Sequence, residues 1–544
     1  MATPLAPILR EAVRGRVADA RAVLTAWNAA FDDAATRTAS LVAAPGVSRA
    51  LRRAGAAGPA LEVCDTSDPH VTGPELRATL TQSRLLALMA LGEDPPLDEV
   101  QAGAALLVAA SDARFDKDER EAAARLLHLA WELLLDRSLH TEGTTSPLTA
   151  DASGWTRSAR TAKVAVWFDQ AIPHRAHWRR PHPRRVRRVL VVTQHGSSFL
   201  AQPRAMAARA GVELREVTLT DLQGAGWVVP RGAAMAALRV AARNGDATEV
   251  PPDLAAGYAW ADQVLVDWCD EAAVLVSATA PPDVEVVVRL HSVEALSVQP
   301  HFVSWERVDR LVLVGSHLAG LLDAVLPRAR RVRRGVIPPY TPAARLQGPL
   351  PPAGVPHVVA LVGWAQPVKD PAWALDVLAA LRREDPRWRL LLVGPDSFAE
   401  PSGRPAIDRY AETYLARASA PDVAGAVDHL PWLEDVRTLD RHASVVLSSS
   451  VRESFGVGLH EAVEAGLLPV VRRWPLVAPF GAPGGTCAPE WVVDTPEQAA
   501  RRILDHAEDD QARERARRWL DREQGALVAA RGYRRQLRWP VPRS

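Results

Sequence analysis

Hydrophobic and polar residues follow one period in the first 150 residues of this chain and another after residue 188. In the first part, segments such as 74–92 and 118–137 place apolar residues three and four positions apart. This spacing puts them on one face of a helix, so it predicts amphipathic α-helices. We therefore expect residues 1–150 to form an all-helical accessory domain, and binding of a protein partner is the hypothesis for its role.

After residue 188, short apolar runs rich in Val and Leu alternate with helix-like stretches. The runs lie at 189–193, 263–268, 284–290 and 310–315 and, beyond a proline-rich break at 335–356, at 357–363, 388–394, 444–450 and 467–473. Nearly continuous apolar strands separated by helices are typical of a parallel sheet covered on both faces. We predict two parallel-sheet units, 188–345 and 355–510, with a ligand cleft between them.

Two further stretches connect or extend these units. Residues 151–187 begin as a polar, turn-rich segment and end in a basic run of Arg, His and Trp. We interpret them as a linker, with contact to phosphates or an acidic surface as the alternative role of the basic run. Residues 511–544 are expected to form a C-terminal helix and tail.

Charge and cysteine content narrow the function classes. With 65 basic and 64 acidic side chains the net charge is +1, so no nucleic-acid partner is expected. Cys64, Cys269 and Cys487 lie far apart and form no paired spacing, which indicates neither a disulfide framework nor a zinc site. No run of about 18 uncharged apolar residues is present. A cytoplasmic location is expected, with peripheral contact at the inner membrane face left open.

Several familiar site patterns are missing from the sequence. It contains no D-x-D or HExxH string, no Cys/His cluster, no P-loop and no G-x-G-x-x-G fingerprint. We therefore expect no metal and no bound cofactor, and the kinase and dehydrogenase classes are disfavoured.

Tryptophans could stack on sugar or base rings, although burial in the core is expected for most of them. The candidates are Trp268, Trp305, Trp364 and Trp432.

The most informative segment is 444–471, which reads as a strand, a loop, a helix beginning near Gly456 and another strand. Exposed N–H groups in the first turn of such a helix form an anion site suited to a diphosphate. Glu453 and Glu461 flank this turn, and a carboxylate can accept two hydrogen bonds from a vicinal diol. Taken singly, each glutamate could equally be a partner of the helix dipole or a solvated helix residue.

The string Glu453-Ser-Phe-Gly-Val-Gly-Leu-His-Glu461, with Gly466 and Pro469-Val-Val after it, resembles the E-x7-E segment of retaining glycosyltransferases of the GT-B fold, family 4 above all. The resemblance implies that Glu453 contacts hydroxyls of the donor sugar and Glu461 the ribose. It also implies that the amides around three consecutive residues lie along the sugar and diphosphate. These residues are Phe455, Gly456 and Val457.

This resemblance covers residues 188–530 and implies an α/β fold of the GT-B type, with two Rossmann-like domains facing a cleft. The N-terminal unit, 188–345, would bind the acceptor, and the C-terminal unit, 355–510, the nucleotide-sugar donor. By the same resemblance, the helix in 511–544 would cross back to the first of these units. The all-helical domain is an addition to this plan.

Residues 357–384 resemble the family's strand, loop and helix with the pattern G-R-x-x-x-x-K-G. Gly363 and Lys369 match it, and a lysine ammonium suits a leaving diphosphate. Lys369 is one of only three lysines in the chain. Trp364 stands in place of the family's arginine and Asp370 in place of its last glycine, so one cation expected near the diphosphate is missing.

The first α/β unit carries weaker signals. His291 ends a predicted strand where the family commonly places a histidine near the reacting sugar, although a strand-end histidine can equally cap the next helix. Gly196 lies in the loop that by resemblance faces the acceptor and diphosphate. The resemblance thus assigns Glu453, Lys369 and His291 as catalytic residues, and Gly196 as the loop residue that approaches the ligand.

The predicted function is metal-independent transfer of a sugar from a nucleotide-sugar donor to an acceptor hydroxyl, with retention of configuration. Two alternatives stay open: a catalytically reduced GT-B protein that acts as a binding scaffold, and another nucleotide-sugar enzyme such as an epimerase or a phosphorylase. The sequence does not identify the nucleotide base of the donor or the sugar that is transferred. Glycans, lipids, proteins and small molecules all remain candidate acceptors, because acceptor sites vary most in this fold.

Overall fold

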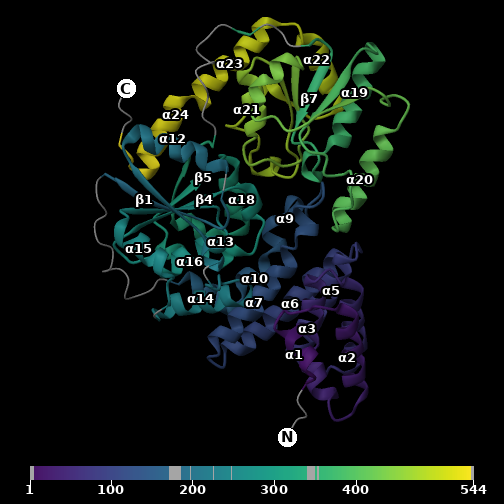
Figure 1. The fold of residues 1–544 in the computed structure, drawn as a ribbon, viewed down its shortest axis with the longest axis vertical. Coiled ribbons are helices and arrows are strands. Elements are labelled where there is room, and N and C mark those ends of the chain that lie inside the picture. Colours follow the sequence, from purple (N-terminus) through teal and green to yellow (C-terminus); the bar gives the residue numbers. More distant parts are fainter. Residues whose placement is uncertain are drawn as a thin grey trace.

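The computed structural model describes residues 5–170, 185–196, 198–224, 226–246, 248–339, 350–351 and 355–540. Three parts follow one another along the chain and pack together: a helical region, a first α/β unit and a second α/β unit (Figure 1). No helix among the described residues is both long and apolar enough to cross a membrane.

The helical region extends further than the periodicity indicated. The predicted helices at 74–92 and 118–137 appear as α5 and α7. Its helices are α1 (Pro7–Val13), α2 (Ala20–Asp32), α3 (Arg37–Arg53), α4 (Ala57–Ser67), α5 (Pro74–Ala90), α6 (Leu97–Phe115), α7 (Arg120–Leu134), α8 (Arg137–His140), α9 (Pro147–Trp155), α10 (Arg157–Thr161) and α11 (Lys163–Asp169).

The beginning of the expected linker, 151–187, is helical instead of a turn-rich connection, because α9, α10 and α11 occupy it as far as Asp169. Apolar residues such as Trp155, Val164 and Phe168 are buried, while polar residues such as Arg157 and Lys163 are exposed. These three helices are too short to show a clear helical period in the sequence. Most of the basic run, residues 171–184, lies outside the described residues.

The first α/β unit is a six-stranded sheet in which every pair of neighbours is parallel, in the order β2-β1-β3-β4-β5-β6. Its strands are β1 (Arg188–Thr193), β2 (Glu213–Thr218), β3 (Gln263–Asp267), β4 (Glu285–Leu290), β5 (Arg310–Leu313) and β6 (Arg333–Val336). Its helices are α12 (Ala201–Ala210), α13 (Leu219–Gly224), α14 (Ala233–Asn244), α15 (Pro252–Trp260), α16 (Glu271–Thr279), α17 (Ser292–Ala295) and α18 (His317–Val325).

The second α/β unit repeats this plan with the order β12-β11-β10-β7-β8-β9, again parallel throughout. Its strands are β7 (Val358–Val362), β8 (Arg389–Val393), β9 (Val427–Leu430), β10 (Val445–Ser448), β11 (Leu468–Arg472) and β12 (Val492–Val493). Its helices are α19 (Pro371–Glu384), α20 (Pro405–Ala418), α21 (Val457–Glu464) and α22 (Pro496–His506). Two Rossmann-like parallel sheets after a helical region confirm the predicted GT-B fold class.

The C-terminal segment returns to the first α/β unit. After α23 (Asp510–Gln524), α24 (Ala526–Gly532) lies against that unit (Figure 1). The backbone N–H of Val186 donates to the Arg538 carbonyl at 3.4 Å, and Trp539 Nε1 donates to the buried Gln263 side chain at 3.1 Å. Tyr533 and Trp539 are buried in the core beneath this sheet.

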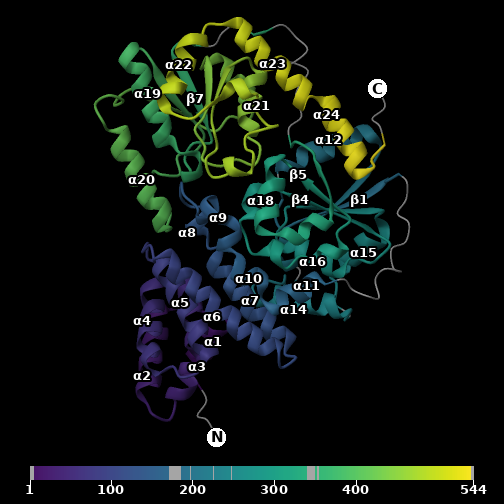
Figure 2. The same ribbon diagram turned by 180° about the vertical axis from the view of Figure 1, so that it is seen from behind.

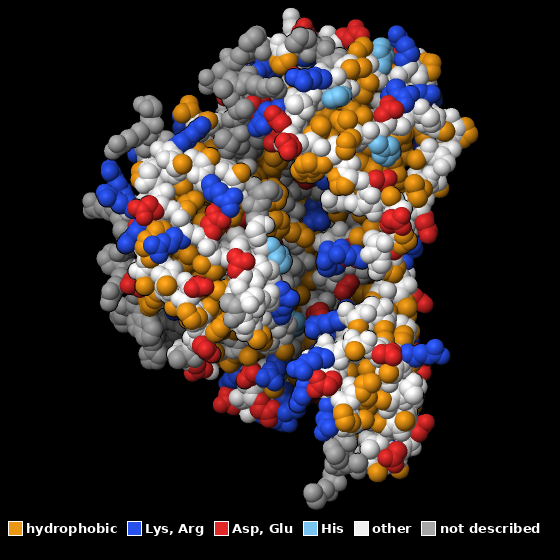
Figure 3. Space-filling view, viewed as in Figure 1, with side chains coloured by type: hydrophobic (Ala, Val, Ile, Leu, Met, Phe, Trp, Pro, Cys, Tyr) orange, Lys and Arg blue, Asp and Glu red, His pale blue; other side chains and the backbone are white. Residues whose placement is uncertain are grey.

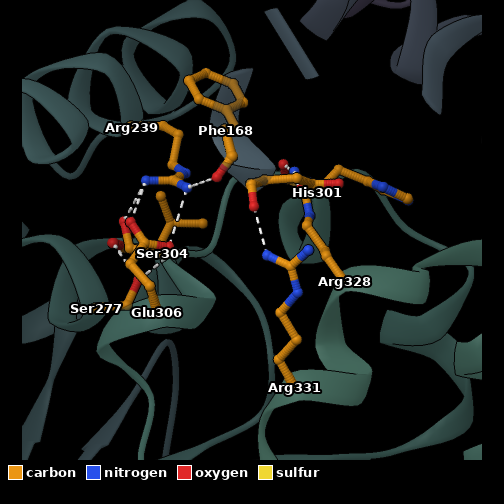
Figure 4. Close-up of polar contacts among 10 residues, drawn as sticks. Phe168, Arg239, Ser277, His301, Ser304, Glu306, Arg328 and Arg331 are labelled. Atoms are coloured by element: carbon orange, nitrogen blue, oxygen red, sulfur yellow. Dashed lines mark hydrogen bonds and ion pairs between the residues drawn. The ribbon is translucent and has the colours of Figure 1, made fainter. Parts of the chain in front are cut away.

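The helical region touches both α/β units. Helix α7 packs on α14, and the buried Arg239 of α14 donates to the Phe168 carbonyl at 3.0 Å and to the Glu306 carboxylate at 2.8 Å (Figure 4). On the other side, α8 and α9 lie between α18 and α20 (Figure 2). Arg409 of α20 pairs there with Asp94 at 3.0 Å. The surface is hollowed where the three parts meet, and Lys and Arg side chains gather along this hollow (Figure 3).

Replacing Arg239 with alanine should lower the free energy of unfolding by about 3 kcal/mol, because the change removes a buried guanidinium that donates to both the Glu306 carboxylate and the Phe168 carbonyl. Urea unfolding measures this difference. Arg209→Ala, at an exposed position of α12, is the matched control and should change stability by less than about 0.5 kcal/mol. Equal losses in the two variants would contradict the interpretation.

Candidate functional site

A cleft lies between the two α/β units, at the edge of each sheet where its parallel strands end. One hollow of about 320 Å³ is lined from the first unit by Phe199, Trp268 and His291, and from the second by Lys369 and Glu453 among others. An adjoining hollow of about 570 Å³ shares several lining residues with it, so the two form one continuous cleft. The shared residues are Phe199, Pro339, Val362, Gly363, Val457 and Gly458.

Helix α21 points its N-terminus into this cleft. Gly456 caps it in the left-handed conformation, with φ 88° and ψ 54°, which glycine adopts without steric cost. Residues 455–459 line the 320 Å³ hollow, so the free N–H groups of the first turn lie at its wall. At Gly458 an added Cβ would come within 3.0 Å of Val362, which explains the small residue there. The predicted residues Phe455, Gly456 and Val457 all lie at the cleft.

Glu453 and Lys369 are in direct contact. Lys369 Nζ lies 2.5 Å from Glu453 Oε1, and the Ser450 hydroxyl donates to the same oxygen at 2.7 Å. Both side chains are largely buried. The Ser449 hydroxyl donates to the Lys369 carbonyl at 2.5 Å, which ties the loop after β10 to the loop after β7. The ammonium is thereby positioned beside the start of α21.

Trp364, at the position of the family's arginine, does not face the cleft. It is fully buried in an aromatic cluster with Phe398, Tyr414 and His429, with ring centroids 5.2 to 5.7 Å from its own. Among the described residues, no arginine lines the 320 Å³ hollow. The missing cation is therefore not replaced by another arginine in that part of the cleft.

Asp370, which stands in place of the last glycine of the family pattern, has a left-handed backbone conformation. Its φ is 46°, in the left-handed region that Asp tolerates better than most residues. Its carboxylate pairs with Arg472 at 2.5 Å and accepts a hydrogen bond from Tyr410 at 2.6 Å. These contacts hold the turn between Lys369 and α19 in place.

His291 both caps a helix and faces the cleft. It is the N-cap of α17, and its Nδ1 lies 3.3 Å from Glu294 Oε1. Its Nε2 has no hydrogen-bond partner among the described residues, and the ring stacks on Trp268 with centroids 4.3 Å apart. Trp268 has a φ of 82°, a strained conformation for a non-glycine residue. The two rings give the first unit a flat wall in the cleft.

A buried ion pair fixes the loop that carries Phe199 beside this wall. Arg289 Nε lies 2.5 Å from Asp267 Oδ1 on the neighbouring strand, and its Nη2 donates to the Phe199 carbonyl at 3.1 Å. Gly196, the residue expected to approach the ligand, is exposed in the same loop and lines neither hollow. Phe199 lines both hollows, and the glycine pattern gave no signal for it.

Glu461 lies in the 570 Å³ hollow with Trp432 and Arg437. Burial raises the pKa of the Glu461 carboxyl above its usual value, and the charge of Arg437, whose Nη2 is 3.9 Å away, opposes that rise. Trp432 is 74% exposed at the wall of this hollow. Of the four tryptophans considered for stacking, Trp268 and Trp432 line the cleft, whereas Trp305 and Trp364 are buried in the core.

Contacts across the cleft bring the two units together at Glu453. The Ser292 N–H donates to the Ser454 hydroxyl at 2.9 Å, and His317 Nε2 lies 3.0 Å from the Glu453 carbonyl. Burial lowers the pKa of His317 to about 4, so near neutral pH the uncharged ring donates to that carbonyl. His317 begins α18 like an ordinary helix-start residue, so the sequence carried no sign of this role.

Comparison with known families agrees with this site. Residues 356–509 match the family model described as glycosyl transferases group 1. This match falls within the second α/β unit and covers nearly all of it. The match contains Gly363, Lys369, Glu453 and Glu461.

Among solved structures, a mutant O-GlcNAc transferase of Thermobaculum terrenum is 17% identical over 99% of each chain, with a TM-score of 0.43. The apo structure of OtsA is 14% identical over 63% of this chain and 95% of its own, with a TM-score of 0.43. Anabaena Alr3699/HepE in complex with UDP-glucose is 14% identical over 64% of this chain and 99% of its own, with a TM-score of 0.42.

Trp364→Arg should destabilise the protein by more than about 3 kcal/mol instead of restoring a cation to the cleft, because the guanidinium would be buried among aromatic rings without a partner. Urea unfolding tests this, with Trp364→Phe as the matched variant that keeps the site apolar and should lose less stability. Equal stability of the two variants would show that residue 364 can reach the solvent or the cleft.

Proposed function

We propose that this protein transfers a sugar from a nucleoside-diphosphate sugar to an acceptor hydroxyl with retention of configuration. The observation that carries the proposal is the contact between Lys369 and Glu453 at the N-terminus of α21, inside the cleft. It combines a cation and a helix N-terminus, both suited to a diphosphate, with a carboxylate suited to sugar hydroxyls.

The donor would lie along the wall of the second α/β unit. The diphosphate takes the place beside the first-turn amides of α21 and Lys369, and Gly363 leaves room for it at the end of β7. The nucleoside extends into the 570 Å³ hollow, where Glu461 accepts hydrogen bonds from the ribose diol. The sugar turns toward the first unit, where Glu453 and His291 hold its hydroxyls.

In the reaction, the bond between the anomeric carbon and the diphosphate oxygen breaks while the acceptor oxygen bonds to the same carbon from the same face. The acceptor proton passes to the departing phosphate oxygen. Lys369 and the N-terminus of α21 stabilise the charge that develops on the diphosphate. The acceptor enters from the first α/β unit, past the Trp268 and His291 rings.

We also propose that no divalent cation is needed, since Lys369 and the helix N-terminus supply the positive charge. Within the described residues, no group of three or more His, Cys, Asp or Glu is placed to hold a metal ion. Under this proposal a chelator such as EDTA leaves the rate of nucleotide release unchanged. A rate that falls with EDTA and returns with Mg²⁺ or Mn²⁺ would refute it.

A second candidate is a scaffold that binds the donor without turning it over. It is favoured by the burial of Trp364 and by the lack of an arginine among the described residues that line the 320 Å³ hollow. Thermal-shift screening with UDP-, GDP-, ADP- and CDP-sugars identifies the donor, because selective binding stabilises the fold. Nucleotide release from that donor then separates the enzyme from the scaffold, which releases none.

Lys369→Met should lower the rate of nucleotide release by about 100-fold or more, because the leaving diphosphate loses its cation. Glu453→Gln should lower it as well, since the neutral amide holds neither Lys369 nor the sugar hydroxyls in the same way. The matched control is Lys163→Met, since Lys163 is an exposed lysine of α11 that pairs with Asp116. Steady-state release assays measure all three, and equal rates for Lys369→Met and Lys163→Met would contradict the role of Lys369.

Donor binding should weaken as the pH falls through the raised pKa of Glu461, because only the carboxylate can accept both ribose hydroxyls. The affinity should be highest above that pKa and fall by up to about tenfold per pH unit below it. Titration calorimetry between pH 8 and pH 4.5 measures the profile. Glu461→Gln should bind weakly with little dependence on pH, whereas Glu434→Gln, in the same hollow, should keep the wild-type profile. An unchanged profile in Glu461→Gln would assign the pH dependence to another group.

A further inference from the structure

A separate pocket of about 190 Å³ lies between the helical region and the first α/β unit. It shares no lining residue with the two hollows of the donor cleft. Helices α7, α10 and α11 form one side of it, and the end of α18 with the turns near it forms the other. The lining residues are Trp131, Arg160, Thr161, Ala165, Asp169, His301, Val325, Leu326, Pro327 and Arg328.

His301 is the most unusual residue of this pocket. The side chain is almost completely buried, and its ring stacks on Trp131 with centroids 3.5 Å apart. Neither ring nitrogen has a hydrogen-bond partner among the described residues. Burial, together with the charges of Arg328 and Arg160, holds the pKa of His301 well below its usual value, so the ring is neutral. A buried imidazole without partners is costly unless something else satisfies it.

Two arginines meet at the same pocket. Arg328 donates to the His301 carbonyl and pairs with Asp169 at 3.2 Å, and Arg160 donates to the Ser153 carbonyl at 2.8 Å. The Nε of each arginine has no hydrogen-bond partner among the described residues. Figure 4 shows His301 and Arg328 next to Arg331, which reaches the carbonyl of Asp169. Among the residues that line the pocket, two guanidinium groups stand against the one carboxylate of Asp169, which leaves an excess of positive charge at its wall.

Apart from Thr161, the rest of the pocket wall is apolar. Trp131, Ala165 and Leu326 are buried, with Val325 and Pro327 beside them. A dry cavity of about 150 Å³ can hold a benzene ring, so a pocket of 190 Å³ has room for a single small ring and a charged group. Apolar walls with a few polar groups that converge are typical of small-molecule sites.

We propose that this pocket binds a small organic acid, a single-ring body carrying one carboxylate, with the ring against Trp131 and Leu326 and the carboxylate at Arg160 and Arg328. His301 completes the site as a neutral donor and acceptor. The function proposed for the cleft does not require this ligand. The pocket lies at the end of α18, whose first residue, His317, touches the Glu453 carbonyl. The acid would therefore bind one short helix away from the donor site.

Binding of 4-fluorobenzoate to the full-length protein, followed by ¹⁹F NMR, tests the proposal. The wild type should bind the probe in the millimolar range or tighter, and 4-fluorobenzamide, of the same shape without charge, should bind at least tenfold more weakly. Arg160→Gln should weaken binding at least tenfold, and Ala165→Phe, which fills the pocket, should abolish it. Arg157→Gln is the matched control, because it removes the same charge from an exposed position of α10 outside the pocket lining.

Lys369→Met distinguishes this site from the donor cleft, since it should leave binding of the probe unchanged. The melting temperatures of Arg160→Gln and Ala165→Phe are compared with that of the wild type, to show that both variants fold. If either variant is destabilised, the milder pair Thr161→Val and Ala165→Leu is used instead. Failure of the wild type to bind the probe at millimolar concentration would overturn the proposal. So would equal binding by Arg160→Gln and Arg157→Gln, or loss of binding in Lys369→Met. Tighter binding of 4-fluorophenyl phosphate would overturn the assignment of a carboxylate.

Discussion

A parallel strand cannot pair with the strand that precedes it through a tight turn, so each connection must return along a covering helix. This constraint acts twice in the chain, once in each sheet, and brings the carboxyl ends of the strands to one edge of each unit. His291 follows β4, Trp268 follows β3, Gly363 follows β7 and the Glu453 loop follows β10. With the two edges facing each other, residues as far apart in the chain as Phe199 and Leu459 line one cleft.

Within that cleft the electrostatics are local. The near-zero net charge of the chain says nothing about the site, because among the described residues that line the 320 Å³ hollow the positive side comes from the Lys369 ammonium and the N-terminus of α21. The buried His317 contributes as a neutral donor to the Glu453 carbonyl, so it holds the loop without adding charge near the N-terminus of α21. Arg437 stands beside Glu461 in the outer hollow, where it also pairs with Glu464 at 2.9 Å.

The sequence predicted the strands that are buried on both faces and missed those at the edges. β1, β3, β4 and β5 in one sheet, and β7, β8, β10 and β11 in the other, all coincide with apolar runs. Three of the four edge strands, β2, β6 and β9, have a solvent-facing side, so polar residues such as those of 213–218 hide the pattern. The fourth, β12, consists of two valines and is too short to give a pattern.

For the site, the motif located Glu453, Lys369 and the start of α21, because spacing along one loop and helix is local information. The burial of Trp364, the strain at Trp268 and the contacts of Ser454 and His317 across the cleft depend on segments far apart in the chain. The same is true of the His301 pocket, whose two sides come from different parts of the molecule. No pattern within a single segment encodes such contacts.

The helical region is held to the two α/β units by different kinds of interaction. Its contact with the first unit is buried and includes Arg239 and the stacked Trp131 and His301 rings. Its contact with the second unit includes partly exposed ion pairs, Arg409 with Asp94 and Arg404 with Glu142, and such pairs contribute little to stability in water. The two α/β units also meet directly, where Ser292 contacts Ser454 and His317 contacts the Glu453 carbonyl. A rotation of the second unit would therefore have to break these hydrogen bonds as well as the ion pairs, whereas the buried contact between the helical region and the first unit would stay intact.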